Sequence, residues 1–294
     1  MNILDELKKN KILLSDGALG TLLQARGLQP GECPELWNIT HKADVRSIAE
    51  SYLLAGSDII ETNSFGGSRL KLSQYGLGDR VNEINKAAAV ISREAAGDKK
   101  HVAGSVGPTG KMLLMGDVTE NELYEAFCEQ AIALEQGGAD IIIVETMSAI
   151  DEASIAVRAA RGNTKCTVII TMTFSISTEN EYHTMMGVSP EEMVISMKEA
   201  GAHIIGSNCG NGIEDMIGIV RAIRTTDNKI PVIIQANAGI PELIDGVTVF
   251  RESPQMMASF VPELIKAGAN IIGGCCGTTP DHIREMARVL KTKP

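Results

Sequence analysis

"AGSDIIETNS" (55–64), "GGADIIIVET" (137–146), "AGAHIIGSNC" (200–209) and "AGANIIGGCC" (267–276) align with one another without gaps. Each segment begins with a glycine in its second position, after an apolar-periodic stretch, as a helix end does when the chain turns left-handed. Each then runs through paired isoleucines, as a strand buried on both faces does. Consecutive segments start 63 to 82 residues apart, which leaves room between them for a helix, another strand and another helix.

The intervening strands are visible as well, in stretches such as "CTVIITMTF" (166–174) and "PVIIQANAG" (231–239). Eight strands are therefore predicted, at 12–18, 58–63, 101–106, 140–145, 166–173, 203–208, 231–236 and 270–275. Helical patterns link them, and Ser189 with Glu192 is typical of a capping box. Eight βα units closing into a (β/α)8 TIM barrel is the economical interpretation. A doubly wound open sheet is the rival, but no GxGxxG follows the first strand.

Composition limits the remaining possibilities. A chain of 294 residues with 44% hydrophobic residues suits a single barrel domain spanning 1–294, preceded by a short amphipathic helix in "MNILDELKKN". The net charge of −10 argues against a nucleic-acid partner. We find no run of 18 apolar residues and no signal-peptide h-region, so we expect no membrane association and a cytoplasmic location.

The barrel fold predicts where the chemistry lies, because active sites of such barrels form at the C-terminal ends of the strands. The aligned segments end in polar residues at that point. Cys209 ends the third segment, and Cys275 and Cys276 end the fourth. These cysteines belong to strands six and eight, so we expect the three sulfurs to meet at one barrel mouth. The adjacent pair requires a bend, which we attribute to the flanking glycines.

Three cysteine sulfurs without an evident fourth ligand describe an open zinc site, since structural zinc is closed by four protein ligands. Soft thiolates also suit Cu(I) or an iron–sulfur cluster, although a cluster usually needs four cysteines. The alternatives to a metal site are a strained disulfide between Cys275 and Cys276, or two small residues without a functional role. A thiolate-rich zinc is a poor Lewis acid but holds an incoming thiol as its thiolate. Thiol alkylation is therefore the reaction class that the cysteines favour.

Several motifs carry a resemblance to a known family. They are "SDGALGTLLQARGL" (15–28), "ETNSFG" (61–66), "GSVGPTG" (104–110), "VET" (144–146), "SNCG" (207–210), "NAGIP" (237–241) and "GGCCGTTPDHI" (273–283). Together, and in this order along almost the whole chain, they resemble the homocysteine S-methyltransferase family. Within that family the chain is most similar to the homocysteine-binding module of cobalamin-dependent methionine synthases.

The resemblance implies a barrel in which Cys209, Cys275 and Cys276 hold a catalytic zinc ion. It implies that homocysteine is the substrate, that the turn of Asp16, Gly17 and Ala18 binds its amino-acid end, and that Glu145 receives its α-ammonium group. Residues placed in the same pocket with less support are Thr62, Asn63 and Ser64, and Asn208 is expected to hydrogen-bond a ligating sulfur. The alternative for Asp16 is a turn former, and for Glu145 a surface salt bridge.

The other cysteines and the histidines have weaker assignments. Cys128 and Cys166 are interpreted as small buried hydrophobic residues, and Cys33 has no assignment. His101 and His203 begin strands at the opposite end of the barrel and are expected to be structural, and His282 lies in the last helix. His183 lies in the loop after strand five, on the active face, where a substrate or partner role is a hypothesis.

We expect no folate- or cobalamin-binding domain in this chain, so the sequence does not indicate the methyl donor. We therefore expect a methyl-corrinoid carried by a partner protein in trans, for which a mobile loop at 174–187 would keep the mouth open. The alternatives are a small donor, S-methylmethionine or a betaine, or a zinc-binding barrel subunit without catalytic activity. A betaine requires an aromatic cage, to which Trp37 and Phe65 would have to contribute. A Schiff-base aldolase would need a lysine at a strand end, and none is present there.

Overall fold

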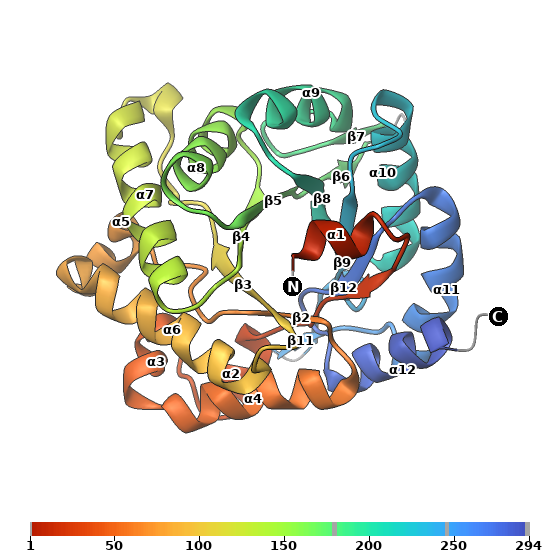
Figure 1. Ribbon diagram of the computed structural model, residues 1–294, viewed down its shortest axis with the longest axis horizontal. Helices are drawn as coiled ribbons and strands as arrows, with labels where there is room; N and C mark the ends of the chain where they lie inside the picture. Colours follow the sequence, from red (N-terminus) through yellow and green to blue (C-terminus); the bar gives the residue numbers. More distant parts are fainter. Residues whose placement is uncertain (1, 178–180, 245–246, 292–294) are drawn as a thin grey trace.

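A ring of eight parallel strands forms the centre of the computed structural model, which describes residues 2–177, 181–244 and 247–291 (Figure 1). The order around the ring is β1-β12-β9-β8-β5-β4-β3-β2. Its members are β1 (Leu13–Leu14), β2 (Ile59–Glu61), β3 (His101–Val106), β4 (Ile141–Met147), β5 (Thr167–Met172), β8 (Ile204–Asn208), β9 (Val232–Ala236) and β12 (Ile271–Gly274). The ring closes where the backbone N–H of Asp58 donates to the carbonyl of Leu14 at 2.7 Å. The predicted (β/α)8 barrel is confirmed.

The paired isoleucines explain why these segments form barrel strands. Successive side chains of a strand point to opposite faces. Ile59 and Ile271 accordingly belong to the cluster inside the barrel, whereas Ile60 and Ile272 belong to the cluster between the sheet and the helices. Each pair therefore contributes to both cores at once.

The outer layer consists of eight long helices, one after each barrel strand. They are α4 (Lys42–Ala55), α6 (Val81–Ala96), α7 (Glu120–Gln136), α8 (Ile150–Asn163), α9 (Pro190–Ala200), α10 (Ile213–Thr226), α11 (Pro254–Ala267) and α12 (Pro280–Lys291). Helix α9 begins with the predicted capping box, because the Ser189 hydroxyl accepts from the N–H of Glu192 and the Glu192 carboxylate accepts from the N–H of Ser189. Gly56 and Gly268 end α4 and α11 in the left-handed conformation that the repeats predict.

The predicted N-terminal helix, α1 (Ile3–Leu7), lies across the centre of the ring in Figure 1. Ile3 and Leu7 are buried in the cluster inside the barrel. The Glu6 carboxylate lies 2.8 Å from Nε2 of His101, the first residue of β3. This helix therefore closes the N-terminal end of the barrel and leaves the opposite end for a site.

The loops that follow the strands at that opposite end carry additional short elements. They are α2 (Gly20–Ala25), η1 (Pro34–Leu36), α3 (Trp37–Thr40), α5 (Arg69–Leu72), η2 (Ser73–Tyr75), η3 (Gly78–Arg80), η4 (Leu113–Met115), the hairpin β6 (Ser175–Ile176) and β7 (Tyr182–His183), and the hairpin β10 (Glu242–Ile244) and β11 (Val247–Val249). The predicted mobile loop at 174–187 contains the first hairpin and, in part, residues outside the described ones. None of the helices in the described ranges has the length and hydropathy needed to cross a membrane.

Candidate active site

Three cysteine sulfurs converge at the C-terminal end of the barrel. Cys209 directly follows β8, and Cys275 and Cys276 directly follow β12. Their Sγ atoms all lie within 4.8 Å of one another, and those of Cys209 and Cys276 are 3.9 Å apart. Two sulfurs of a tetrahedral zinc site with Zn–S bonds of 2.3 Å are about 3.8 Å apart. The cluster therefore fits a zinc ion bound through three sulfurs.

The backbone around the cysteines is adapted to this cluster. Cys209 has a φ of 59°, a left-handed conformation that is uncommon for a residue with a side chain. Gly277 turns left-handed after the adjacent pair, with a φ of 77°. Gly273 and Gly274 do not have positive φ; instead, a Cβ on Gly274 would clash with the side chain of Thr278. The bend that we attributed to the flanking glycines is therefore made by Gly277, while Gly273 and Gly274 permit close packing.

The three thiols influence one another strongly. Hydrogen bonds from Cys275 and Cys276 lower the pKa of the Cys209 thiol. The same contacts, together with burial, raise the pKa of Cys275 well above its usual value, and the contact with Cys209 raises that of Cys276. The protein alone thus favours one thiolate, and a bound cation is needed to stabilise three.

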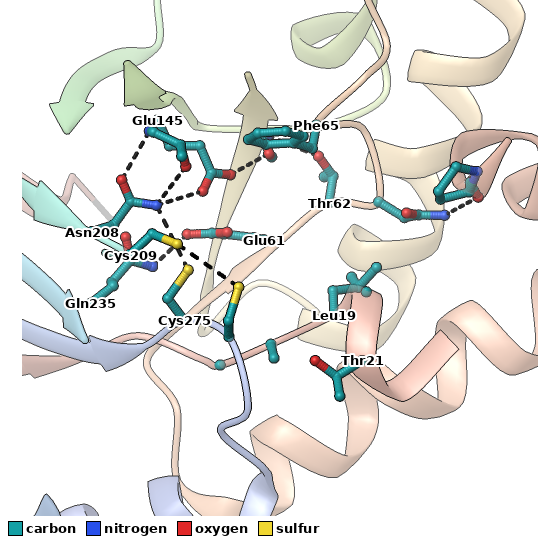
Figure 2. Close-up of a pocket in the computed structure, with 18 of the residues that line it drawn as sticks. Leu19, Thr21, Glu61, Thr62, Phe65, Glu145, Asn208, Cys209, Gln235 and Cys275 are labelled. Carbon is teal, nitrogen blue, oxygen red and sulfur yellow. Dashed lines mark hydrogen bonds between the residues drawn. The ribbon is translucent and has the colours of Figure 1, made fainter. Parts of the chain in front are cut away.

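A cavity of about 310 Å³ lies beside the sulfurs (Figure 2). Its wall combines the strand ends with α2 and the loop before α3. The lining residues are Gly17, Ala18, Leu19, Gly20, Thr21, Leu23, Pro34, Glu35, Glu61, Thr62, Asn63, Ser64, Phe65, Ser105, Glu145, Thr146, Asn208, Cys209, Gln235, Gly274, Cys275 and Cys276. Within the described parts of the chain, three acidic residues and no basic residue line it. The cavity therefore suits a ligand that carries a cationic group.

Glu145 lies at the polar end of this cavity. The pairing of β4 with β5 shifts register between Val144 and Met147, and Thr146 has a φ of 61°. One carboxylate oxygen of Glu145 accepts from the hydroxyl of Ser105, and the other accepts from the side-chain amide of Asn208 at 3.2 Å. Burial, followed by the charge of Glu61, raises the pKa of Glu145 well above its usual value. Glu145 is thus buried in the pocket rather than exposed in a surface salt bridge.

Asn208, the last residue of β8, connects Glu145 with the sulfurs, as Figure 2 shows. Its Oδ1 accepts from the N–H of Thr146 at 2.9 Å and from the hydroxyl of Thr171 at 2.8 Å. Its Nδ2 also approaches Sγ of Cys275 at 3.8 Å. The sulfur contact expected for Asn208 is therefore present, with Cys275 as the partner.

The three residues of the turn after β1 have different locations relative to the cavity. Gly17 and Ala18 line the cavity, but Asp16 lies behind the wall, where its carboxylate accepts from the N–H of Glu61 at 2.8 Å. The N–H of Ala18 already donates to the hydroxyl of Thr278 at 3.0 Å. The family resemblance implied that all three residues contact the substrate, whereas in the structure Asp16 does not line the cavity and joins β1 to β2.

The three residues predicted at the rim of strand two, Thr62, Asn63 and Ser64, all line the cavity. Their side chains are buried and mutually engaged: the hydroxyls of Thr62 and Ser64 are 2.5 Å apart, and Asn63 donates to the carbonyl of Pro34 at 2.7 Å. These residues therefore shape the wall with few free polar atoms.

Glu61 and Gln235 line the cavity but were missed in the sequence. Nε2 of Gln235 donates to Glu61 at 2.6 Å, while Oε1 of Gln235 is buried without a partner in the described residues. Burial raises the pKa of Glu61. The available signal was the position of Glu61 directly before Thr62 and Asn63, the residues that the sequence already placed at the rim of strand two.

The residues with weaker assignments lie outside the cavity. Trp37 is buried and stacked on His41 with ring centroids 4.1 Å apart, so Phe65 is the only aromatic side chain that lines the cavity in the described parts of the chain. Cys166 is buried as expected, but Cys128 is only half-buried because it lies at the edge of the packed face of α7. His183 lies in β7 and is not part of the cavity wall.

Two further histidines and Cys33 also have defined surroundings. His101 contacts Glu6, and Nδ1 of His203 accepts from the N–H of Val168 at 2.9 Å, both at the end of the barrel opposite the cysteines. Cys33 is buried, with its sulfur 3.3 Å from the carboxylate of Glu35.

Comparisons with known proteins extend over nearly the whole chain. Residues 13–290 match the family model described as homocysteine S-methyltransferase. Methionine synthase of Mycobacterium leprae is 31% identical over an alignment of 304 positions, which covers 97% of this chain and 25% of that protein. Methionine synthase of Mycobacterium tuberculosis is also 31% identical, over 98% of this chain and 25% of that protein. The chain thus spans about a quarter of the length of these curated relatives.

Among solved structures, the metallated form of the homocysteine methyltransferase MmuM from Escherichia coli matches with a TM-score of 0.79. It is 23% identical, and the match covers 97% of this chain and 98% of MmuM. Pyruvate carboxylase from Rhizobium etli matches with a TM-score of 0.53 and 15% identity, over 95% of this chain and 27% of that one. At these identities the two matches show the shared barrel fold.

Proposed function

Because this chain belongs to the homocysteine S-methyltransferase family, we propose that it transfers a methyl group to the sulfur of homocysteine, giving methionine. The observation that carries the proposal is the convergence of Cys209, Cys275 and Cys276 beside a cavity lined by acidic residues. Three soft ligands suit the binding of a further thiol, and the acidic wall suits the ammonium group of an amino acid.

Zinc is the metal that we propose for the sulfur cluster. Cys209, Cys275 and Cys276 would hold it and leave one tetrahedral position for the substrate sulfur. A bound zinc ion would keep the thiol of homocysteine deprotonated at neutral pH, where a free thiol with a pKa of about 8.5 is mostly protonated. The three protein sulfurs offset the positive charge, which preserves the nucleophilicity of the substrate.

The cavity wall would orient the amino-acid end of homocysteine. Glu145 would receive the α-ammonium group, since its carboxylate faces the cavity and no described basic residue competes for it there. Gly17 and Ala18 would lie against the α-carboxylate. Asp16 would act indirectly, by holding Glu61 and the end of β2 in place.

The methyl donor that we propose is a methyl-corrinoid carried by another protein module. The S–C bond would form as the cobalt–carbon bond breaks, with the bonding electron pair remaining on cobalt. Support comes from the exposed apolar side chains in the loops at the barrel mouth, notably Leu114, Met185 and Leu243, which a protein-borne donor would cover. Greater identity to methionine synthases than to MmuM points the same way.

The first experiment mixes zinc-loaded protein with methylcobalamin and homocysteine, and follows cobalamin absorbance together with methionine formation. Homocysteine-dependent demethylation that is lost in Cys275→Ala, and in wild-type protein after zinc is removed by a chelator, is the expected result. Cys128→Ala is the matched control, because this half-buried thiol lies in α7, away from the cavity. Methionine formation that persists in Cys275→Ala would rule out the cysteine cluster as the site.

A small cationic donor, such as S-methylmethionine or a betaine, is the alternative that the acidic cavity favours. Both would be tested in the same assay in place of methylcobalamin. A betaine is disfavoured, because Phe65 alone cannot build an aromatic cage around a quaternary ammonium. Turnover with S-methylmethionine and not with any corrinoid would transfer the donor assignment to the small molecule.

A further inference from the structure

Glu61 and Glu145 lie side by side at the polar end of the cavity, yet the function proposed above assigns a ligand only to Glu145. Each follows by two residues an isoleucine of the cluster inside the barrel, Ile59 on β2 and Ile143 on β4, so both side chains point inward. The two carboxyls are within hydrogen-bond distance of each other, and Figure 2 shows both beside the sulfurs. An ionised carboxylate only accepts hydrogen bonds, so a hydrogen bond between these two requires a proton on one of them.

The side-chain donors that contact this pair within the described residues are neutral. Glu145 accepts from the hydroxyl of Ser105 and from the amide of Asn208, and Glu61 accepts from Nε2 of Gln235 at 2.6 Å. No lysine, arginine or histidine of the described ranges lines the cavity. Two carboxylates at hydrogen-bond distance repel each other, so without a cation the pair favours a single negative charge.

The other titratable groups around the pair add no positive charge either. Asp16, in the loop after β1, has its pKa raised well above the usual value by burial and then by the charge of Glu61. Tyr52 of α4 has its pKa raised by burial and by the charges of Asp16 and Glu61, so it stays a neutral phenol. On the remaining side lie the thiols of the cysteine cluster, which carry no positive charge. A ligand must therefore supply the cation.

Gln235 provides independent evidence for a ligand at this position. The residue is 3% exposed and lines the cavity, and its Nε2 donates to Glu61. Its Oε1 is buried without a partner among the described residues, and burying an amide acceptor in this way costs free energy. An ammonium group carries three N–H donors. Glu61, Glu145 and Oε1 of Gln235 offer one acceptor for each of them.

We propose that Glu61 and Glu145 hold one proton between them until an ammonium group binds, and that binding releases this proton to the solvent. The proposal rests on the proposed function, from which it takes an amino acid as the ligand. The ligand keeps all its own protons, and no bond within it forms or breaks. The carboxyl proton passes to water, and both carboxylates are then ionised beside the cation. The pair thus responds to the positive charge of the ligand, and a thiol without an ammonium group leaves it protonated.

L-Methionine, the product of the proposed reaction, isolates this proton, because it carries an ammonium group but has no thiol to ionise. Its binding to zinc-loaded protein is measured by calorimetry at neutral pH in two buffers that differ in their enthalpy of ionisation, which gives the number of protons released. We expect about one proton for wild type and about none for Glu61→Gln, which has no carboxyl proton to lose. Wild-type affinity should also rise about tenfold per unit of pH while the pair is protonated, and that of Glu61→Gln should not.

Glu152→Gln is the matched control. Glu152 is also buried and accepts from the N–H of Thr109 at 2.8 Å, but it does not line the cavity. This variant should therefore release about one proton, as wild type does. The shared proton would be overturned by an equal release from wild type and Glu61→Gln. It would also be overturned if wild type releases no proton, a measurement that requires no variant.

Homocysteine distinguishes a failure of this inference from a failure of the proposed function. Because bound zinc would also ionise its thiol, wild type should release about one proton more with homocysteine than with methionine. Equal release with the two ligands would overturn the zinc-bound thiolate and leave the shared proton in place. If neither amino acid binds to wild type, both proposals are overturned.

Discussion

Glu145 illustrates how surroundings determine the chemistry of a single side chain. It is buried, it is held by Ser105 and Asn208, and it lies near a second carboxyl, that of the half-buried Glu61. Burial raises the pKa of both groups, so the protein by itself disfavours two negative charges in the cavity. An ammonium group would reverse that balance, because a cation stabilises the ionised carboxylates.

At this scale we predict that Glu145→Gln discriminates against the amino group of the substrate. The amide preserves size but loses the charge, so kcat/KM for homocysteine should fall about 10- to 100-fold, the range of a hydrogen bond to a charged group. The matched measurement uses 4-mercaptobutanoate, which lacks the α-amino group and should be little affected. An equal loss with both thiols would show that Glu145 does not bind the ammonium group.

Individual site residues differed in how well the sequence could predict them. The meeting of Cys209 with Cys275 and Cys276 follows from the aligned repeats, since equivalent positions on parallel strands reach the same end of a barrel. The location of Asp16 did not follow, because the direction of a side chain in a turn depends on its partner, here the N–H of Glu61. Gln235 was also missed, because it ends an apolar strand without a neighbouring polar motif.

The turn between β12 and α12 operates as one structural element. Its Thr278 hydroxyl donates to the carbonyl of Cys275 at 2.7 Å and accepts from the N–H of Ala18. Gly274 provides the space for that side chain. The turn therefore joins the cysteine pair to the loop after β1.

For this element we predict that Gly274→Ala destabilises the fold and disturbs the cysteine pair. The added methyl group would overlap the side chain of Thr278, and overpacking of this kind costs about 1–3 kcal/mol. Unfolding in urea measures the loss. Gly20→Ala is the control for stability, because a Cβ there has no atom within 4 Å. A stability for Gly274→Ala equal to that of wild type would contradict the packing argument.

Secondary-structure elements could be predicted from the sequence where they are long or have a regular apolar pattern. Six of the eight barrel strands carry paired isoleucines that pack on both faces, and these were predicted close to their observed bounds. The first strand, predicted at 12–18, is shorter, because β1 spans only Leu13–Leu14. The hairpins β6–β7 and β10–β11 were not predicted, because they are short, and their described side chains are exposed or only partly buried. Their pairing depends on the loops in which they lie rather than on a periodic apolar face.

At the scale of the whole molecule, a network of charges attaches α1 to the closed end of the barrel. Burial alone would lower the pKa of His101, but hydrogen bonds and charges of Asp140 and Glu6 outweigh it, so the pKa is raised. Burial alone would raise the pKa of Glu6, but Lys11 and His101 outweigh it, so the pKa is lowered. Both groups thus stabilise the fold in their charged forms.

We predict that this network makes stability depend on pH. The contribution of His101 is complete below the pKa of an unfolded histidine, about 6.5, and is lost as pH rises through its raised folded pKa. The contribution of Glu6 is lost as pH falls through its lowered folded pKa. The stability difference between wild type and His101→Gln, measured by unfolding in urea, should therefore shrink as pH rises above neutrality.

His203 provides a contrasting control, because burial lowers its pKa. Protonation of His203 opposes folding. Replacing His203 should therefore raise the free energy of unfolding at low pH, whereas replacing His101 should lower it. A difference for His101→Gln that stays constant from pH 5 to pH 9 would exclude the network as a source of pH dependence.

A unit of a strand, a helix, a strand and a helix occurs four times around the ring, and the two strands of each unit have different roles. The second strand of each unit leads to groups that face the cavity: Glu61 on β2, Glu145 on β4, Asn208 on β8 with Cys209 directly after it, and the cysteine pair after β12. The intervening strands mainly supply walls and supporting contacts. Asp16, after β1, accepts from the N–H of Glu61, and Ala236, at the end of β9, accepts from the N–H of Cys275. The molecule is thus a ring of four similar units that differ in the residues at the C-terminal ends of their strands. The chemistry of such a ring can change when the residues at the C-terminal end of one unit are replaced. The isoleucines shared by the units keep the strands of the other three units in place.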